Sequence, residues 1–431
     1  MLSGARAAAA AALARVLDDG VSAQPALHSV LSSHALSERD RALCTELFYG
    51  TLRLVGPLEK SLLRSADKPG RGLDERIRPH LLIAAYQLQH LAERVPAHAV
   101  VNEAVDAVGR TRPGLEGFAN ALLRRLGSPL SASLRPDAPL EEIADAWGVP
   151  HALARAVVDG LPAQEHAAAI AALSARPATW AMCFAGPPPG TTPHRFVPGC
   201  HVLPGGKVTE VAGFADGDLL VMEPGTAICA LAVAAIPGQT ILDLCAAPGA
   251  KTMLLAHVVG EQGKIIAVEQ SAKRATRITD NADRMAVRPR VEVRITDVLA
   301  LQQQTPVDAV LLDAPCSGFG TTRRKPEIKL RRTMDDVDKA AVLQAKLLAH
   351  AARFVKKGGV LVYSVCSPMP QEGRQQVDAF VREHRDFARE DLRTVLPWLP
   401  HDAVDEDGQA RLLPHAHDTD AFFIARLRRQ P

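Results

Sequence analysis

The hydrophobic pattern divides the chain into two contrasting parts. Through residues 1–130, apolar side chains recur every three or four positions, as at Leu81, Ala84 and Leu88, which is typical of amphipathic helices. From about residue 217 onward, short apolar runs alternate with helical patterns. Such alternation predicts strands joined by crossover helices, and therefore an α/β domain with a doubly wound, mostly parallel sheet.

The strands expected in this second part are short and buried. We expect them at Thr240–Leu244, Lys264–Glu269, Val291–Ile295, Val307–Leu312, Gly359–Tyr363 and Ala421–Arg426. Helical patterns lie between most of them, notably at Ser271–Met285, Met334–Phe354 and Glu372–Arg385.

The middle of the chain has a different character. A short helical part, Glu141–Leu173, precedes a stretch between Gly186 and Gly206 that contains six prolines and is typical of loops. The chain is therefore expected to be multidomain, since 431 residues exceed one ordinary core. We predict an all-α domain at 1–130, a small α+β linker subdomain at 131–216 and the α/β domain at 217–431.

Composition excludes several classes of protein. The seven cysteines are scattered without a CxxC spacing, so neither a disulfide framework nor a zinc site is indicated, and no metal is expected. Reduced thiols suggest the cytoplasm. No apolar stretch reaches the roughly 18 residues that span a bilayer, so no membrane partner is expected. The net charge of +2 does not by itself indicate a nucleic-acid partner. We expect the protein to be a monomer.

Two cysteines lie in short cassettes, each directly after a predicted strand. Cys316 lies within Asp313–Gly318 and Cys366 within Tyr363–Ser367. Both thiols would face the crevice at the carboxyl edge of the sheet, where such folds bind ligands. Free cysteine is often only a small buried residue, but two such cassettes and Asp313 favour covalent chemistry.

Cytosine methylation at carbon would use all three groups. A thiolate that adds to C6 makes C5 nucleophilic, an acid beside N3 stabilises the adduct, and a second thiol can assist product release. Asp313 and the two cysteines fit these roles. Methyltransferases that act on an exocyclic amine place Asn/Asp-Pro-Pro-aromatic at this strand end, whereas Asp-Ala-Pro-Cys stands here.

A cofactor site is indicated at the ends of the first three strands. Small residues after the first strand let the backbone approach a ligand closely, although neither GxGxxG nor a P-loop is present. Glu269 ends the second strand and could accept the hydroxyls of a ribose, and Asp297 follows the third and could accept from an adenine amine. This combination fits S-adenosylmethionine better than NAD or ATP. The loop residues concerned are Cys245, Ala246, Ala247, Pro248, Gly249, Ala250 and Lys251.

A basic run lies between the two cysteine cassettes. Charge runs are usually solvated faces, but one beside an active site for a polymer favours contacts with phosphates. The predicted RNA contacts are Arg323, Arg324, Lys325, Lys329, Arg331 and Arg332.

The same cassettes resemble those of the Sun/Fmu (RsmB) family of ribosomal RNA cytosine-C5 methyltransferases. The matching segments are Asp243–Thr252, Asp313–Gly318, Tyr363–Ser367, Arg324–Lys329 and Asp420–Phe423. The N-terminal part resembles the RNA-binding domain of the antitermination factor NusB. Its matching segments are Glu46–Gly50, Ala85–Gln87, Val95–His98, Val101–Val105 and Gly117–Asn120.

The resemblance implies a Rossmann-like class I methyltransferase domain and assigns roles to residues. Cys366 corresponds to the family's nucleophile and Cys316 to its release thiol, while Cys245–Lys251, Glu269, Asp297 and Asp313 correspond to contacts with S-adenosylmethionine. The implied substrate is a cytosine in unassembled small-subunit (16S) ribosomal RNA, flipped out of its stack.

Three departures from the family pattern leave alternatives open. Ala250 stands where the family usually has glycine, and alanine would be strained if that position needs a positive φ. Val365 replaces a threonine and Ala421 a glycine. The alternatives are a non-catalytic RNA-binding or ribosome-assembly factor that retains the fold, and the same chemistry on transfer RNA.

Overall fold

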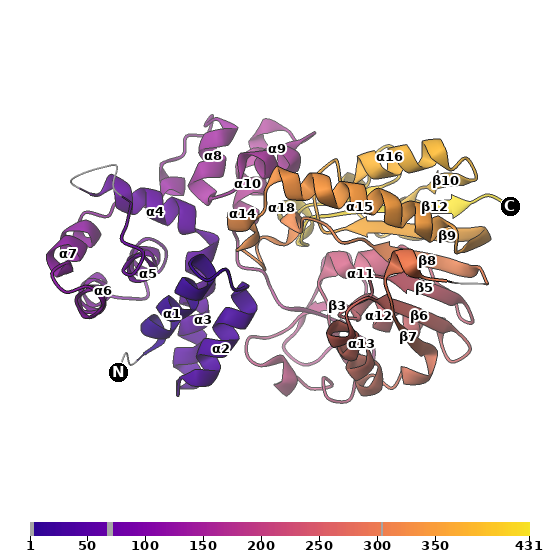
Figure 1. Cartoon of the computed structure of the whole chain (residues 1–431), viewed down its shortest axis with the longest axis horizontal. Coiled ribbons are helices and arrows are strands. Elements are labelled where there is room, and N and C mark those ends of the chain that lie inside the picture. Colours follow the sequence, from indigo (N-terminus) through magenta and orange to yellow (C-terminus); the bar gives the residue numbers. More distant parts are fainter. Residues whose placement is uncertain (1–3, 67–71, 303–304) are drawn as a thin grey trace. The chain divides into compact units, whose positions relative to one another are not determined.

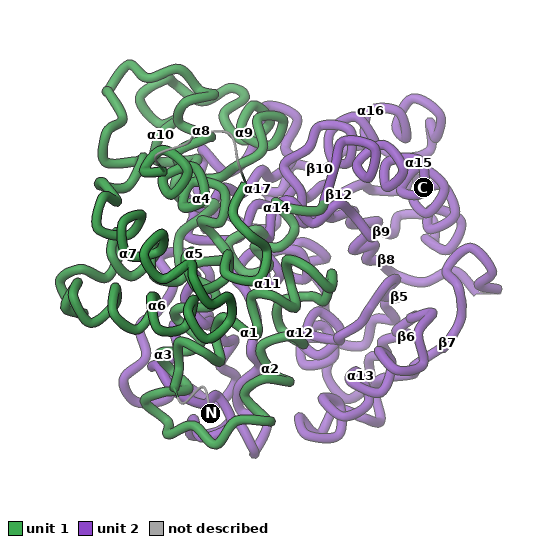
Figure 2. The backbone as a smooth tube through the Cα atoms, turned by 60° about the vertical axis from the view of Figure 1, so that its left-hand side comes forward, with its two compact units in different colours: residues 1–176, 322–331 green, residues 177–321, 332–431 purple. Residues whose placement is uncertain are grey.

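The computed structural model describes residues 4–66, 72–302 and 305–431. The chain forms two compact units, Met1–Arg176 with Thr322–Arg331, and Pro177–Thr321 with Arg332–Pro431 (Figure 2). This division differs from the three domains expected from the sequence. Residues of the expected linker are shared between the two units, and a short segment of the C-terminal half belongs to the first unit.

The first unit is helical, which confirms the expected all-α N-terminal domain (Figure 1). Its core contains the fully buried Leu13, Leu47, Phe48 and Leu81. The helices are α1 (Ala5–Leu17), α2 (Ala23–Ser33), α3 (Glu38–Arg53), α4 (Val55–Arg64), α5 (Arg78–His90), α6 (Ala97–Thr111), α7 (Glu116–Arg124), α8 (Leu140–Trp147), α9 (His151–Val158), α10 (Ala163–Ala172) and α14 (Ile328–Arg331). Helices α8–α10 belong here because α8 packs against α4.

The second unit is built on an eight-stranded mixed sheet. Its strand order is β10-β12-β9-β8-β5-β6-β7, and β11 also pairs with β12. The five strands from β9 to β7 are parallel, whereas β10, β11 and β12 pair antiparallel. The strands are β5 (Thr240–Leu244), β6 (Lys264–Glu269), β7 (Val291–Ile295), β8 (Val307–Asp313), β9 (Val355–Val365), β10 (Phe387–Glu390), β11 (Ala410–Leu412) and β12 (Phe422–Arg429).

Helices cover both faces of this sheet, as a doubly wound fold requires. Figure 1 shows α15 and α16 on one side, and α12 and α13 on the other. Side chains alternate accordingly: Ile241 of β5 packs with one helical layer, while Leu242 and Leu244 pack with the other. The helices of this unit are α11 (Pro224–Leu231), α12 (Ala250–Val259), α13 (Ala272–Arg284), α15 (Met334–Ala352), α16 (Arg374–Glu383), α17 (Leu392–Val395) and α18 (Pro414–His417).

A small antiparallel sheet contains three strands from the expected linker subdomain, 131–216, and a fourth strand that follows it. Its strands are β1 (Trp180–Cys183), β2 (Thr192–Pro193), β3 (Cys200–Val202) and β4 (Leu219–Val221), in the order β2-β3-β1-β4. Trp180, Met182 and Leu220 share one apolar core with α11 and α12, so this sheet is part of the second unit. In the described part of the chain, no helix combines the length and apolar character needed to cross a membrane.

Candidate active site

The order of the parallel strands reverses between β5 and β8. From β5 the chain proceeds outward through β6 and β7, then crosses to β8 and β9 on the other side. Ligands bind at such reversal points, outside the carboxyl ends of the strands. Cys245 follows β5, Asp313 ends β8 and Cys366 follows β9, so the predicted site residues lie at this edge.

The two predicted cysteines lie in contact. Their Sγ atoms are 3.2 Å apart, and both side chains are half-buried. The hydrogen bond to Cys366, together with burial, raises the pKa of Cys316 well above its ordinary value. Cys316 therefore keeps its proton at neutral pH, and its S–H can face the neighbouring sulfur.

Asp313 is held from two sides beside these thiols. Its Oδ2 accepts from Lys251 Nζ at 2.6 Å, and its Oδ1 accepts from Ser364 Oγ at 2.9 Å. Burial lowers the pKa of Lys251, but the charge and hydrogen bond of Asp313, together with Cys229 and Asp243, leave the pKa raised. The two hydrogen bonds fix the orientation of the Asp313 side chain. Ser364, inside the second cassette, is a partner that the sequence analysis did not single out.

The loop after β5 has an unusual backbone conformation. Cys245 has φ of +59°, and Gly249 has φ of +103°. A Cβ on Gly249 would also lie 3.1 Å from the Cα of Ile278, so glycine is required at this position. Ala250 is the first residue of α12, and its helical conformation suits alanine. The glycine that the family usually has there is not needed for a positive φ.

A buried acid joins the two ends of the same loop. Asp243 on β5 is fully buried and its Oδ2 accepts from Thr252 Oγ1 at 2.6 Å. Burial raises the pKa of Asp243 to about 7, opposed by the Thr252 hydrogen bond. Both residues lie within the matched Asp243–Thr252 cassette, but neither was predicted as a site residue because the bond joins strand to helix.

The two predicted ribose and adenine acids lie on neighbouring strands. Glu269 ends β6 and pairs in register with Ile295 of β7, two residues before Asp297. Glu269 is 2% exposed and accepts from Ser271 N at 2.9 Å, while Asp297 accepts from Leu299 N at 2.9 Å. These backbone bonds fix both carboxylates at the same edge as Gly249. Such a set of acids beside a tight glycine loop fits an adenosine group.

The basic run is only partly exposed, because it includes α14 of the first unit. Lys329 is 7% exposed, and its Nζ donates to Arg53 O at 2.7 Å, Ser174 Oγ at 2.7 Å and Trp147 O at 3.3 Å. Burial, aided by the Arg53 charge, lowers the pKa of Lys329 to about 7. This arrangement corrects the expectation that Lys329 contacts phosphate, because three internal acceptors enclose its amine.

Other members of the run also bind within the first unit. Arg331 donates to Val16 O at 2.6 Å and to Val21 O at 2.8 Å, and the carbonyl of Arg323 accepts from Arg53 Nε at 2.8 Å. Arg323 is itself buried and Arg324 half-buried, whereas Lys325, Arg331 and Arg332 are exposed. Arg332 pairs with Asp336 at 3.2 Å.

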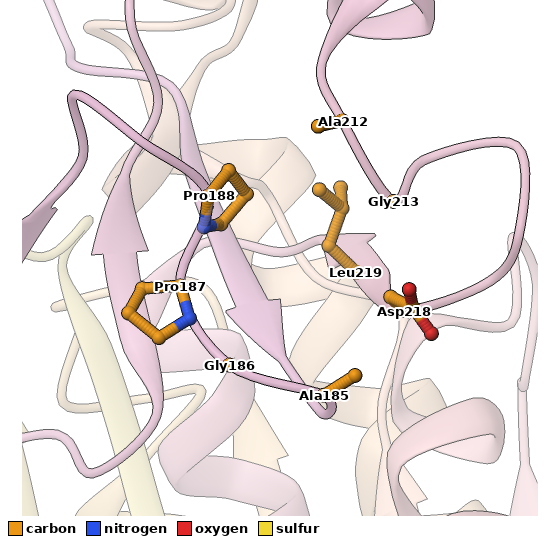
Figure 3. A pocket seen from close by; sticks show the side chains of 8 residues that line it. All are labelled: Ala185, Gly186, Pro187, Pro188, Ala212, Gly213, Asp218 and Leu219. Atoms are coloured by element: carbon orange, nitrogen blue, oxygen red, sulfur yellow. The ribbon is translucent and has the colours of Figure 1, made fainter.

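A separate pocket of about 220 Å³ lies in the small-sheet region. Figure 3 shows Pro187 and Pro188 on one side of it, and Gly213 and Leu219 on the other. Its charged lining residue is Asp218, and no predicted site residue lines it. Within the described residues, no group of three or more histidine, cysteine or acidic side chains is placed to hold a metal ion.

Comparison with known proteins decides the family. The model of the "16S rRNA methyltransferase RsmB/F" family matches residues 230–428, and that of the NusB family matches residues 3–128. Ribosomal RNA small subunit methyltransferase B of Serratia proteamaculans is 34% identical, with 98% of both chains covered. This chain belongs to the RsmB/F methyltransferase family. As a family member it is an S-adenosylmethionine-dependent ribosomal RNA methyltransferase, and the family assignment made from the sequence is confirmed.

Other relatives agree with this assignment. A probable ribosomal RNA small subunit methyltransferase B of Bacillus subtilis is 29% identical, with 94% of each chain covered. The crystal structure of a protein called PH0851 matches with a TM-score of 0.75 at 25% identity, covering 99% of both chains. The RsmB/F fold of this protein, with a NusB-like helical domain and a mostly parallel methyltransferase sheet, is therefore confirmed.

Proposed function

We propose that this RsmB/F-family protein methylates C5 of a cytosine in 16S ribosomal RNA through a covalent bond between Cys366 and C6. The observation that carries the proposal is the pair of thiols 3.2 Å apart beside an aspartate held by Lys251. Two adjacent thiols at a ligand-binding edge have no use in methylation of an amine or a hydroxyl. They match a reaction in which one sulfur must be attached and later expelled.

The two thiols take different roles in this proposal. We assign the attack to Cys366, which corresponds to the family's nucleophile, and product release to Cys316, whose pKa is raised by its hydrogen bond to Cys366 and by burial. Addition of Cys366 Sγ to C6 pushes electrons to C5, and bound S-adenosylmethionine supplies the electrophilic methyl group. A water molecule then removes the C5 proton, and the electrons of that bond restore the C5–C6 double bond and expel the sulfur of Cys366, to which the S–H of Cys316 can donate.

Asp313 acts on the other side of the base in this proposal. Its carboxyl group, oriented by Lys251 and Ser364, would give a proton to N3, and this proton would neutralise the negative charge that attack at C6 pushes onto the ring. A group whose position is fixed before reaction stabilises a transition state without reorganisation. The acid's two hydrogen bonds therefore support a catalytic role for Asp313.

The cofactor contacts are proposed at the ends of β5, β6 and β7. Backbone atoms of Cys245–Lys251 would lie against the donor, Glu269 would accept from its ribose and Asp297 from its adenine amine. The RNA would be bound by the NusB-like helices and by exposed basic residues of the run, Lys325 and Arg332. Phosphate contacts from such residues contribute affinity without sequence preference.

Tritium transfer from methyl-labelled S-adenosylmethionine to ribosomal RNA tests this proposal. Wild-type protein should label 16S RNA, Cys366→Ser should not, and the control Cys183→Ser, in β1, should label normally. Undiminished labelling by Cys366→Ser would remove the nucleophile from the proposal. Labelling of transfer RNA in place of ribosomal RNA would change the substrate but keep the chemistry.

A further inference from the structure

A closed polar network lies directly behind the two cysteines. Its centre is Glu372, which is fully buried between β9 and α16. Oε1 of Glu372 accepts from Ser317 N at 2.7 Å, and Oε2 accepts from Ser317 Oγ at 2.6 Å and from Ser367 Oγ. Ser317 follows Cys316 and Ser367 follows Cys366, so one carboxylate binds the residue after each thiol.

Two further residues, from α15 and β9, connect this network to the surrounding helix and strand by hydrogen bonds. Gln344 of α15 is fully buried, and its Nε2 donates to Glu372 Oε1 at 3.2 Å and to Pro315 O at 2.9 Å. Tyr363 of β9 donates its hydroxyl to the carbonyl of Glu372. The loop that carries Cys316 is therefore attached on both sides of the cysteine, through Pro315 and through Ser317.

We propose that Glu372 is a positioning residue that holds the two cysteine loops together, so that both sulfur atoms reach the same pyrimidine ring. The inference rests on the proposed function, because that reaction requires both sulfur atoms to lie close to one base. Glu372 acts on the two cysteines through the neighbouring Ser317 and Ser367, whose hydroxyls donate to its carboxylate.

The chemistry of the network explains why an acid stands at this position. Four donors converge on the side chain: a backbone N–H, two hydroxyls and a side-chain amide. A carboxylate accepts at both oxygens, and it satisfies all four. An apolar side chain would leave the Ser317 N–H buried without a partner, which is costly enough to displace the loop.

The requirement for this network comes from the reaction. Cys366 must reach C6 while Cys316 stays close enough to assist departure of the same sulfur. A displacement of roughly 1 Å at a reacting group can cost about 100-fold in rate. A carboxylate shared by the residues after both thiols removes relative movement of the two loops.

The test compares Glu372→Leu, which removes every acceptor, with Glu372→Gln, which can still bond at both ends because serine hydroxyls also accept. We expect Glu372→Leu to lower kcat about 100-fold, whereas KM for RNA and binding of S-adenosylmethionine stay within about twofold. Glu372→Gln should restore most of the rate. The control is Asp405→Asn, since Asp405 organises the separate loop 405–409 through Asp407 and Gln409. It should retain wild-type kcat.

A second measurement needs neither RNA nor methyl transfer. Diamide oxidises neighbouring thiols to a disulfide, and the rate of Cys316–Cys366 cross-linking reports how closely the loops are held. Glu372→Leu and Ser367→Ala should both cross-link about tenfold more slowly than wild type, since effective concentration falls when the loops separate. If Glu372→Leu does not fold, Ser367→Ala alone decides.

The outcomes separate the two proposals. Wild-type rates of cross-linking and of transfer in the folded variants would overturn the positioning role. If the variants cross-link slowly but the wild-type protein transfers no methyl group to cytosine, the positioning role is retained and the proposed reaction is rejected.

Discussion

Cys316 and Cys366 have different surroundings although their sulfur atoms are in contact. The hydrogen bond between them and burial raise the pKa of Cys316, so that one thiol remains a proton donor at neutral pH. In the proposed reaction this proton stays with Cys316 while Cys366 is bonded to the base.

Removal of the release thiol should therefore separate attack from departure. In Cys316→Ala, Cys366 can still add to C6, but the adduct should persist. We expect a covalent protein–RNA species that migrates slowly on a denaturing gel. The double variant Cys316→Ala/Cys366→Ser should not form it. Normal turnover by Cys316→Ala without a shifted band would contradict the assigned role.

Ala250 shows how a single departure from a family pattern is decided by backbone conformation. The left-handed conformation of the cofactor loop falls on Cys245 and Gly249, and Ala250 begins a helix. Alanine has a better helix propensity than glycine. The substitution therefore gives no physical reason to regard the loop as impaired.

At the level of elements, Gly320 connects the two cysteine loops to β12. Its N donates to Cys366 O at 3.0 Å, and its O accepts from Ala421 N at 3.0 Å. A Cβ on Gly320 would lie 2.0 Å from Ala421 O and 2.8 Å from Cys366 O. Both neighbours are backbone atoms that cannot move without shifting a loop.

Gly320→Ala should consequently lower the free energy of unfolding by about 1–3 kcal/mol and abolish methyl transfer. The control is Gly117→Ala in α7, where a Cβ meets nothing within 4 Å. It should leave activity unchanged and raise stability by up to about 1 kcal/mol. Thermal denaturation and tritium transfer measure both effects. Equal behaviour of the two variants would refute this account of Gly320.

At the level of elements, Lys329 of helix α14 should make the folding stability depend on pH. The pKa of Lys329 is lowered from 10.5 to about 7 by burial. Between these values the unfolded chain binds more protons than the folded one, so stability should rise with pH. The rise is about 1.4 kcal/mol per pH unit within this window.

The measurement compares the melting temperature of wild type with that of Lys329→Met at about pH 7.5 and about pH 9. The advantage of wild type should grow at the higher pH. A constant difference would mean that the lysine stays charged, held by carbonyls at the ends of α3 and α8.

Elements were predictable where the pattern is local. Strands β5, β6 and β7 lie at the expected residues because each is a short buried run. β9 begins earlier than expected, at Val355, because exposed Lys356 and Lys357 interrupt the apolar pattern. β10 and β11 were missed, since each is a short strand paired antiparallel with β12 and has no apolar run of its own.

At the scale of the whole molecule, contacts between residues far apart in the chain could not be predicted from the sequence. The thiols and Asp313 could be found because each lies in a compact cassette. Glu372 and Gln344 could not, because their role arises only when α15 and two loops meet. The same holds for Lys329, whose partner Arg53 is 276 positions away. A charge run that looked like an RNA-binding surface is therefore partly an internal contact.

Binding of the whole protein to RNA should distinguish the exposed from the buried members of this run. Affinity falls with salt in proportion to the number of phosphates contacted. Lys325→Ala and Arg332→Ala should each reduce the slope of log affinity against log salt by about one. Lys329→Met should leave the slope unchanged. A change for Lys329→Met equal to that of the exposed residues would contradict the placement of α14.

The central claim is that this protein forms 5-methylcytosine in small-subunit ribosomal RNA. Bisulfite sequencing of total RNA from cells with and without the gene tests it most directly, because bisulfite converts cytosine but spares its 5-methyl derivative. We expect that a 16S cytosine resists conversion when the gene is present, becomes convertible when it is deleted, and stays convertible when Cys366→Ser replaces the wild type. Identical 16S conversion patterns in all three strains would contradict it.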